Sequence, residues 1–258
     1  MQADDDPLYR DPELADFYDL ENGWAADLEF CRTLAKDARS VLDLGCGTGE
    51  LAVALAEGRD VVGVDPARAM LDIARGKPAG RGVDWVEADA RTVQLARRFD
   101  LILLTGHAFQ VFLTGEDRRA VLQTIAAHLA PGGRFILDTR NPQAQEWLEW
   151  VPGASDRLIE HPRFGTVKAW NDMTHDPATG IVTYETVYEI TTSGKRLSAS
   201  ARIAFPEKAE LEALITEAGL TIERWMGDWQ GNDFTEDARE MIPVGGRQGL
   251  GNFEFDSP

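Results

Sequence analysis

A glycine-rich turn directly after a short apolar run is the feature that most constrains the fold of this chain. Residues 41–44 are mostly apolar, and glycines follow at positions 45, 47 and 49. Glycine permits a sharp turn and lets a ligand lie against bare backbone. Residues 50–57 have a helical pattern that ends at Gly58, a typical helix C-cap. The pattern predicts a strand, a tight turn and a helix in succession.

The same alternation of strand and helix continues along the chain. Further buried strands are expected at residues 61–64, 83–86, 101–104 and 135–137. Helices are expected from Pro66 to Gly76 and from Thr114 to Leu129, where Pro131-Gly132-Gly133 is expected to stop the second one. Strands that alternate with helices pair in parallel through right-handed crossovers. We therefore predict an α/β fold with an open, mostly parallel sheet flanked by helices.

The pattern changes after about residue 155. Strand-like segments follow one another with turns and no helix between them, at residues 166–172, 181–190 and 196–205. We interpret residues 155–206 as an antiparallel β-insertion in a single domain. The core of that domain is expected at about 37–150 and 207–258, after an N-terminal helical segment at 1–36.

The charge of the chain limits the classes of partner. Asp and Glu number 44 against 26 Lys and Arg, which gives a formal net charge of −18. Such a surface repels phosphate backbones and anionic membranes, so neither DNA nor a membrane is an expected partner. The N-terminus lacks the pattern of a signal peptide and no apolar run is long enough to span a membrane, so the cytoplasm is the expected compartment. No metal site is expected, because Cys31 and Cys46 form no CxxC pair and no ligand cluster is apparent.

Several polar and glycine residues fall at the predicted strand ends. In open parallel sheets, ligands bind beyond the carboxyl ends of the strands. Gly45, Asp65, Asp89 and Thr105 all fall there. The glycine spacing is GxGxG, whereas a dinucleotide fold would place its third glycine at Glu50, whose carboxylate would repel a pyrophosphate. The loop therefore suits a ligand without phosphate groups.

Two acids at strand ends match the polar groups of an adenosine. The carboxylate of Asp65 can accept hydrogen bonds from both hydroxyl groups of a ribose. Asp89 can accept from the amino group of an adenine, and the backbone N–H of Ala90 can meet a nitrogen of its ring. These positions are compatible with an adenosine-containing ligand.

The ordered motifs resemble those of the class I S-adenosylmethionine-dependent methyltransferases. The matching elements are Asp43-x-Gly45-x-Gly47-x-Gly49, Asp65, Glu87-Ala88-Asp89-Ala90, Phe99-Asp100-Leu101-Ile102 and Leu-Ala-Pro-Gly-Gly at 129–133. The resemblance spans about residues 40–140. It implies a Rossmann-like, seven-stranded sheet and S-adenosyl-L-methionine as the cofactor. It also implies transfer of a methyl group to a nitrogen or oxygen atom of a small molecule, since small-molecule members carry similar β-insertions.

The resemblance assigns roles to further residues. Asp43 would organise the glycine loop, including Gly45 and Gly47, near the methionine part of the cofactor. The carbonyl group near Thr105 would accept the methionine ammonium. Tyr18 resembles a tyrosine that closes over the cofactor carboxylate, although it could equally be an ordinary helix-packing residue.

Three residues are candidates for contact with the methyl acceptor. His107 follows the fourth strand and is the best candidate for a general base, or else it only shapes the pocket. Arg140 could hold an acceptor carboxylate or pair with an acidic residue of the protein. Trp229 could line an apolar acceptor pocket or belong to the core.

Other functions stay open at this point. DNA amino-methyltransferases carry Asp/Asn-Pro-Pro-Tyr after the fourth strand, where this chain has Thr105-Gly106-His107-Ala108, so a DNA base is disfavoured as the acceptor. The alternatives are a protein or RNA methyltransferase and a non-catalytic S-adenosylmethionine-binding protein. An NAD-dependent oxidoreductase is the least favoured because of the glycine spacing. The insertion is expected to cap the acceptor site, and in some family members such an insertion also builds a homodimer.

Overall fold

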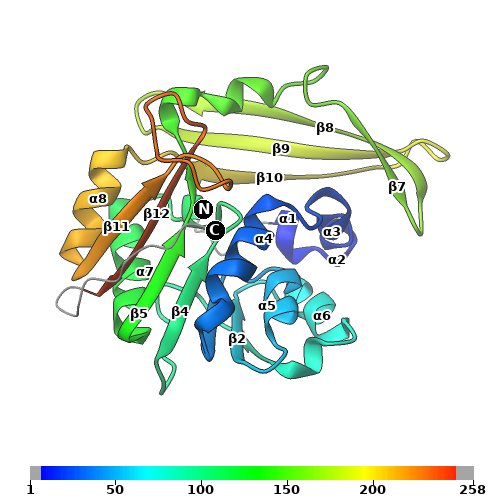
Figure 1. The fold of residues 1–258 in the computed structure, drawn as a ribbon. Helices are drawn as coiled ribbons and strands as arrows, with labels where there is room; N and C mark the ends of the chain where they lie inside the picture. Colours follow the sequence, from blue (N-terminus) through cyan, green and yellow to red (C-terminus); the bar gives the residue numbers. More distant parts are fainter. Residues whose placement is uncertain (1–6, 248–258) are drawn as a thin grey trace.

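The computed structural model describes residues 7–247, and residues 1–6 and 248–258 of the expected terminal segments lie outside this range. A central sheet has the strand order β11-β12-β5-β4-β1-β2-β3, with the short β6 paired to β12 (Figure 1). Its strands are β1 (Ser40–Leu44), β2 (Asp60–Asp65), β3 (Val83–Glu87), β4 (Phe99–Leu104), β5 (Leu129–Leu137), β6 (Thr139–Arg140), β11 (Leu220–Met226) and β12 (Glu240–Arg247). The prediction of a Rossmann-like, mostly parallel seven-stranded sheet is confirmed.

The sheet changes its direction of growth at β1. Strands β2 and β3 follow on one side of β1 and strands β4 and β5 on the other, all of them parallel. Strand β12 then joins β5 in the antiparallel direction, and β11 pairs with β12 at the edge of the sheet. A ligand crevice is expected where the strand order reverses, beyond the carboxyl ends of β1 and β4.

Helices cover both faces of the sheet. The α-helices are α1 (Pro7–Arg10), α2 (Pro12–Ala15), α3 (Tyr18–Glu21), α4 (Ala26–Leu34), α5 (Glu50–Leu55), α6 (Arg68–Gly76), α7 (Gly115–His128) and α8 (Lys208–Glu217). The 3-10 helices are η2 (Ala35–Asp37), η3 (Gly80–Gly82), η4 (Ala108–Val111), η5 (Pro142–Ala144) and η6 (Glu146–Glu149).

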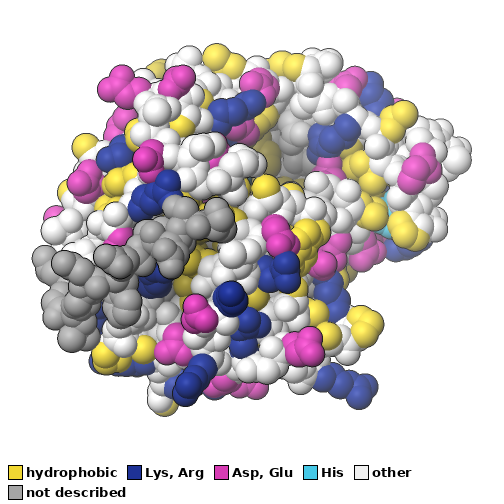
Figure 2. Space-filling model, viewed as in Figure 1, with side chains coloured by type: hydrophobic (Ala, Val, Ile, Leu, Met, Phe, Trp, Pro, Cys, Tyr) yellow, Lys and Arg dark blue, Asp and Glu magenta, His cyan; other side chains and the backbone are white. Residues whose placement is uncertain are grey.

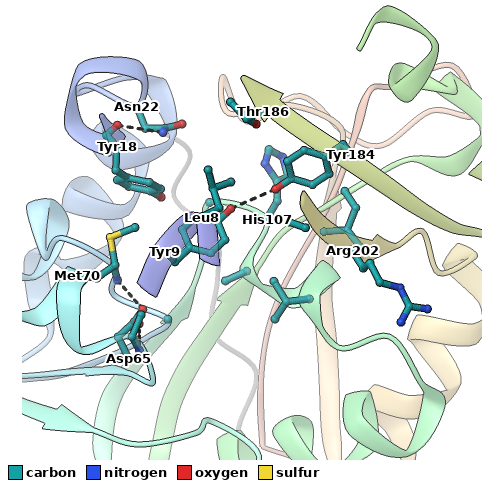
Figure 3. Close-up of a pocket in the computed structure, with 18 of the residues that line it drawn as sticks. Leu8, Tyr9, Tyr18, Asn22, Asp65, Met70, His107, Tyr184, Thr186 and Arg202 are labelled. Atoms are coloured by element: carbon teal, nitrogen blue, oxygen red, sulfur yellow. Dashed lines mark hydrogen bonds between the residues drawn. The ribbon is translucent and has the colours of Figure 1, made fainter. Parts of the chain in front are cut away.

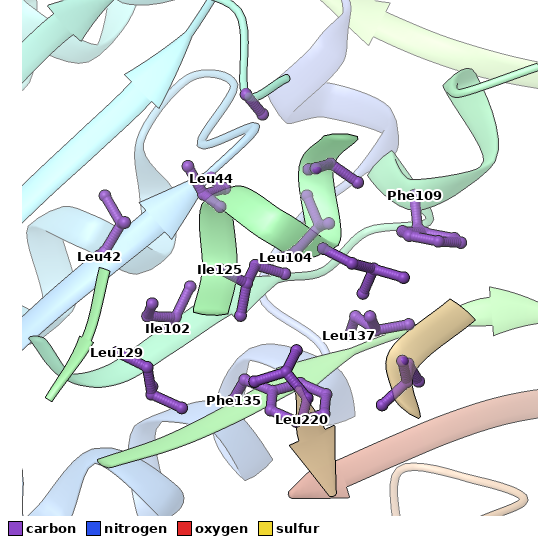
Figure 4. Close-up of a cluster of buried hydrophobic side chains, with 14 of the residues drawn as sticks. Leu42, Leu44, Ile102, Leu104, Phe109, Ile125, Leu129, Phe135, Leu137 and Leu220 are labelled. Carbon is purple, nitrogen blue, oxygen red and sulfur yellow. The ribbon is translucent and has the colours of Figure 1, made fainter. Parts of the chain in front are cut away.

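Each face of the sheet has its own apolar core. On one face, buried side chains of α7 and α8 such as Ile125 and Leu211 pack against Leu42, Ile102 and Phe135 of the strands (Figure 4). On the other face, buried residues of α4 and α5 pack against the alternate residues of the same strands, among them Val41, Leu101 and Leu103. Burial on both faces explains why these strands are uniformly apolar in the sequence.

The second helix predicted from the sequence ends earlier than expected. Helix α7 ends at His128, and Leu129 already pairs with Phe99 as the first residue of β5. The Pro131-Gly132-Gly133 segment therefore lies within an irregular part of that strand and does not terminate the helix. A Cβ atom at Gly133 would lie 2.8 Å from the carbonyl oxygen of Phe99, so the close approach of the two strands requires glycine there.

The insertion forms a separate antiparallel sheet of order β10-β9-β8-β7 above the carboxyl edge of the central sheet (Figure 1). Its strands are β7 (Arg157–His161), β8 (Gly165–Asp176), β9 (Ile181–Ile190) and β10 (Arg196–Ala204). The sequence prediction of three strands missed β7, in which charged residues interrupt the apolar ones. The N-terminal helices lie beneath this sheet, where Leu14 and Phe17 are buried against Ile159, Val167 and Tyr188.

The exposed face in Figure 2 carries acidic and basic side chains interspersed with one another. Among residues 7–247, no helix is both long and apolar enough to cross a bilayer.

Candidate functional site

A cavity of about 500 Å³ lies where the sheet changes direction, between the carboxyl ends of the parallel strands and the inner face of the insertion. Its walls come from the N-terminal helices, the glycine loop, the ends of β2 and β4, and the insertion (Figure 3). The residues predicted from the sequence that line it are Tyr18, Gly45, Gly47, Asp65, Asp89, Ala90, Thr105, His107 and Arg140. Asp43 and Trp229 do not line it.

The backbone N–H groups of Gly45, Cys46 and Gly47 in the glycine loop have acceptors on β2. Gly45, Gly47 and Gly49 all have left-handed backbone conformations, with φ of 69°, 52° and 73°. The N–H groups of Gly45 and Cys46 donate to the carbonyl oxygen of Val64, and that of Gly47 donates to Asp65. Because these donors already have acceptors within the protein, they cannot cradle a phosphate group. The loop fits a ligand that rests on bare backbone, as S-adenosylmethionine would.

The third glycine of the loop makes room for a tryptophan. A Cβ atom at Gly49 would lie 2.3 Å from the ring of Trp85, and one at Gly63 would lie 2.5 Å from the same ring. The indole nitrogen of Trp85 donates a 2.8 Å hydrogen bond to the carbonyl of Gly80, which fixes the ring in place. Packing against Trp85 thus adds to the left-handed backbone conformation as a reason for glycine at position 49, a reason that the motif alone did not reveal.

Asp65 joins the loop to the end of β2 and also faces the cavity. Its Oδ2 accepts from the N–H of Gly47 at 2.9 Å, and its Oδ1 accepts from the N–H of Ala67 at 2.7 Å. Burial raises the pKa of Asp65, although both backbone hydrogen bonds favour the ionised form. Each carboxylate oxygen has a second lone pair, so the group can still accept hydrogen bonds from ribose hydroxyls.

Asp43 lies in β1 just before the loop and is almost completely buried. Burial, and then the neighbouring charge of Asp65, raise its pKa to about 7. Asp43 does not face the cavity, so any influence on the cofactor would act through the loop and through its charge.

Asp89 is held by a neighbouring arginine. The backbone N–H of Arg91 donates to Asp89 at 2.7 Å, and its Nε donates at 3.0 Å, while the guanidinium also pairs with Asp117. Burial opposes ionisation of Asp89, but the hydrogen bonds and charge of Arg91 outweigh it and lower the pKa of the carboxyl. Asp89 is therefore ionised and fixed in orientation at the cavity wall, next to the buried Ala90.

The N-terminal helices bridge the loop and the insertion. A Cβ atom at Gly47 would lie 3.8 Å from the ring of Tyr18, so this ring lies directly over the loop. Tyr9 packs edge-to-face on Tyr18, and its hydroxyl lies 3.3 Å from that of Tyr184 on β9 (Figure 3). The sequence prediction overlooked Tyr9 and Tyr184, because their contact joins positions 175 apart in the chain.

His107 sits in a strained turn after β4, with φ of 60°. Its backbone N–H donates to the carboxylate of Asp138, at 3.0 and 3.2 Å from the two oxygens. Its Nε2 lies 3.0 Å from Oε1 of Glu240 and 3.5 Å from Oδ2 of Asp138. Burial lowers the pKa of His107, but the charges of Asp138 and Glu240 outweigh burial and the opposing charge of Arg140, so that its pKa is raised.

The sequence analysis did not predict that His107, Asp138 and Glu240 lie together. Their ligand-type atoms lie within 4.8 Å of one another. The 3.0 Å separation of His107 and Glu240 is that of a direct charge-assisted hydrogen bond, so we describe the cluster as a charge network. The expectation that the protein uses no metal stays a prediction.

Arg140 and Trp229, which were predicted to contact the methyl acceptor, lie in different places. Arg140 lines the cavity, but its guanidinium donates to Glu146 at 3.1 Å and to Gln110 at 3.0 Å, which is the protein-internal pairing left open by the sequence. Trp229 instead packs at 5.9 Å against the ring of Phe30 and lines a second cavity of about 560 Å³. The expectation that Trp229 lines the acceptor pocket needs correction, because it follows β11 on the side of the sheet covered by α4.

The inner face of the insertion adds polar groups that the sequence prediction did not single out. Arg157 donates to Asn171 at 2.8 Å, and Asn171 donates to Thr186 at 2.8 Å. Arg157 and Tyr188 both donate to the carboxylate of Glu21 in α3. All five line the cavity. The period-two alternation of the strands could have identified the members on β8 and β9 as facing one side.

Comparisons with known proteins agree with this geometry. A family profile described as a methyltransferase domain matches residues 41–133. A cypemycin N-terminal methyltransferase from a Streptomyces species is 31% identical over 94% of this chain and 99% of its own length. The structure of the CcbJ methyltransferase from Streptomyces caelestis superposes with a TM-score of 0.75 at 22% identity, over 92% of this chain and 96% of that one. An S-adenosylmethionine-dependent methyltransferase from Clostridium acetobutylicum gives a TM-score of 0.77 at 17% identity, over 92% and 98%.

Proposed function

Because this chain belongs to the S-adenosylmethionine-dependent methyltransferases, we propose that it transfers a methyl group to a small molecule and that the acceptor atom is an amine nitrogen. The observation that carries the proposal is the charge network at the cavity wall, where His107 is held between Asp138 and Glu240. The raised pKa of His107 suits it to take a proton from an ammonium group, whose pKa is about 8–10. An aliphatic hydroxyl group, with a far higher pKa, would give up its proton to this base only at great cost.

The comparison with the full-length relative supports an amine acceptor. That relative is named for methylation at a peptide N-terminus, and the match covers nearly the whole of both chains. A small amine or the N-terminus of a short peptide is therefore the acceptor class that we propose.

We assign the cofactor to the side of the cavity formed by the glycine loop. Asp65 would hold the ribose, Asp89 and Ala90 the adenine, and the backbone of Gly45 and Gly47 would lie against the methionine part. When bound, S-adenosylmethionine supplies a methyl group made electrophilic by its sulfonium. The protein has to align the acceptor with that group, exclude water and accept a proton from the amine.

The insertion is proposed to cap the acceptor side of the cavity. Its inner face contributes Tyr184, Thr186 and Tyr188, and the N-terminal helices attach it to the loop. A homodimer through the insertion and the exclusion of DNA stay predictions. The outer face of the insertion carries Lys168 and Arg196 on either side of Trp170, which argues against a large apolar contact there.

A panel of acceptors tests the proposal. Formation of S-adenosylhomocysteine would be measured with short peptides that have a free N-terminal amine, with the same peptides acetylated, and with hydroxyl compounds of similar size. We expect turnover with free amines and none with the acetylated peptides. Turnover of the hydroxyl compounds, with amines inert, would overturn the proposal while leaving the family assignment intact. Titration calorimetry with S-adenosylmethionine separately tests the cofactor side.

A further inference from the structure

Two charge pairs cross the wall between the main cavity and the second cavity. His107 lines the main cavity, and its partner Glu240 lines the second one. Arg140 likewise lines the main cavity, and its partner Glu146 lines the second one. In both pairs the basic group faces the main cavity and the carboxylate faces the other side. The wall is therefore polarised, with a carboxylate on the second-cavity side of each basic group.

The ring of His107 is oriented for proton transfer from the main cavity to the second cavity. Its Nε2 makes its contacts with Glu240 at 3.0 and 3.1 Å, and the backbone N–H is held by Asp138. The other ring nitrogen, Nδ1, has no hydrogen-bond partner within residues 7–247. In the neutral form of His107, with the proton on Nε2 donated to Glu240, Nδ1 is an acceptor in a residue that lines the main cavity.

The groups around His107 differ in their access to the second cavity. Asp138, at the end of β5, is only 1% exposed and does not line the second cavity. Arg140, on β6, carries a permanent positive charge and cannot take a proton. Glu240, at the start of β12, is 16% exposed and lines the second cavity. Among these neighbours, only Glu240 contacts His107, has a carboxylate oxygen that can take a proton, and lines the second cavity.

We propose that Glu240 is a positioning residue that relays the proton of each turnover from His107 to the second cavity. This inference rests on the proposed amine acceptor. Replacement of one N–H bond of the amine by an N–C bond leaves one proton to be removed. That proton goes to Nδ1 of His107, while Nε2 releases its own proton to Oε1 of Glu240, which gives it to water in the second cavity. Exchange of the Nδ1 proton for one on Nε2 through solvent then returns His107 to its starting tautomer before the next turnover. The product amine thus leaves a main cavity that has not accumulated charge.

The substitution Glu240→Gln isolates the proton step. Glutamine keeps an oxygen that can accept the hydrogen bond from Nε2, but it cannot take the proton. We expect kcat to fall about tenfold or more with the KM for S-adenosylmethionine unchanged. Glu240→Asp should retain part of the activity, and added formate should restore part of the activity of Glu240→Gly. A Glu240→Gln enzyme with the kcat of the wild type between pH 6 and 9 would overturn the proposal.

A second measurement needs no acceptor at all. Loss of the Glu240 charge should lower the pKa of the His107 imidazole by about 1 unit or more, as followed by NMR of the cofactor-free protein. An unchanged pKa would overturn the coupling between the two residues, whatever the acceptor proves to be. If the wild type methylates no amine but the pKa falls as expected, the proposed acceptor fails and the His107–Glu240 coupling stands.

A matched control is available in the second cavity. Asp233 also lines this cavity, is largely exposed and pairs with Arg224, away from His107. Asp233→Asn removes the same charge from the same cavity. We expect it to leave both kcat and the pKa of His107 at their wild-type values. Equal effects of Asp233→Asn and Glu240→Gln would show a general field effect and overturn the relay.

Discussion

The backbone N–H of Gly47 donates a 2.9 Å hydrogen bond to the carboxylate of Asp65, and so links the glycine loop to the end of the neighbouring strand. The same carboxylate lines the main cavity and is proposed to hold the cofactor ribose. Asp65 therefore shapes the loop on which the cofactor would rest as well as contacting the cofactor directly.

The substitution Asp65→Ala should weaken S-adenosylmethionine binding about tenfold or more, since each charged hydrogen bond is typically worth about 1.5–3 kcal/mol. It should also lower the free energy of unfolding of the cofactor-free protein, because the N–H groups of Gly47 and Ala67 lose their acceptor. Calorimetry and urea denaturation measure the two effects. The exposed Asp84, which pairs with Arg97 near the start of β3, is the control, and Asp84→Ala should leave cofactor binding unchanged. Equal affinities of the Asp65→Ala protein and the wild type would contradict the assignment.

Substitution of Gly49 tests whether packing against Trp85 contributes to the need for the third glycine of the loop. Gly49→Ala places a methyl group 2.3 Å from the Trp85 ring and also keeps a left-handed backbone conformation, so it should destabilise the fold by about 3 kcal/mol or more. The control is Gly58→Ala, which has a φ of 71° but open space around its Cβ position, and which should cost only about 1–2 kcal/mol. Urea denaturation compares the two. Similar losses would mean that the conformation of Gly49, and not Trp85, explains the glycine.

Asp43 makes stability depend on pH. Its pKa of about 7 in the folded protein lies above the ordinary value of 3.8, so the folded state binds a proton that the unfolded state has released. The resulting stabilisation is fully present below about pH 4 and is lost as pH rises through about 7. At one proton per molecule, the unfolding free energy of the cofactor-free protein should fall by about 2 kcal/mol between pH 5 and pH 7 from this group.

The variant Asp43→Asn keeps the shape of the side chain without a titrating proton. It should flatten this part of the stability profile, as measured by urea denaturation at several pH values. Asp138, whose pKa burial raises to about 6, contributes with the same sign and should leave a residual slope. A profile as steep as that of the wild type would show that Asp43 is ionised throughout.

The hydrogen bonds that join Arg157, Asn171 and Thr186 allow a test of whether the insertion caps the acceptor side of the cavity. Asn171→Ala removes the link between Arg157 and Thr186 on the inner face and leaves the apolar contacts of the sheet in place. We expect the KM for the acceptor to rise about fivefold or more, at about 1 kcal/mol for a lost hydrogen bond, with cofactor affinity unchanged. Asp172→Ala, on the next and exposed position of the same strand, is the control. A rise in the KM for S-adenosylmethionine alone would assign this face to the cofactor instead.

Deletion of the whole insertion would be a poorer test of the cap than these point variants. Leu14 and Phe17 of the N-terminal helices are buried against this sheet, and Tyr18 follows Phe17 directly. Removing the sheet would therefore also release the tyrosine that lies over the glycine loop. Point variants separate the acceptor side from the cofactor side where a deletion would not.

Local patterns accounted for most of the central sheet. Runs such as Leu101–Leu104 are apolar because both faces of the strand are covered, and this property is visible without neighbours. The prediction that Pro131-Gly132-Gly133 ends α7 was wrong, because Leu129 already pairs with Phe99, a contact between residues that are distant in the sequence. Strand β7 was missed for a similar reason, since it is defined by its pairing with β8 and has little pattern of its own.

The sequence by itself determined the alternation of strands and helices in the parallel part of the central sheet, the glycine loop and the acids at the strand ends, because each depends on neighbours only a few residues away. Only the tertiary structure decided that Trp229 packs against α4 outside the main cavity, and that Glu240 lies 3.0 Å from a histidine 133 positions earlier. Such contacts depend on how distant strands are placed side by side in the sheet. That placement is set by the packing of the whole core, and it leaves no periodic signal in the chain.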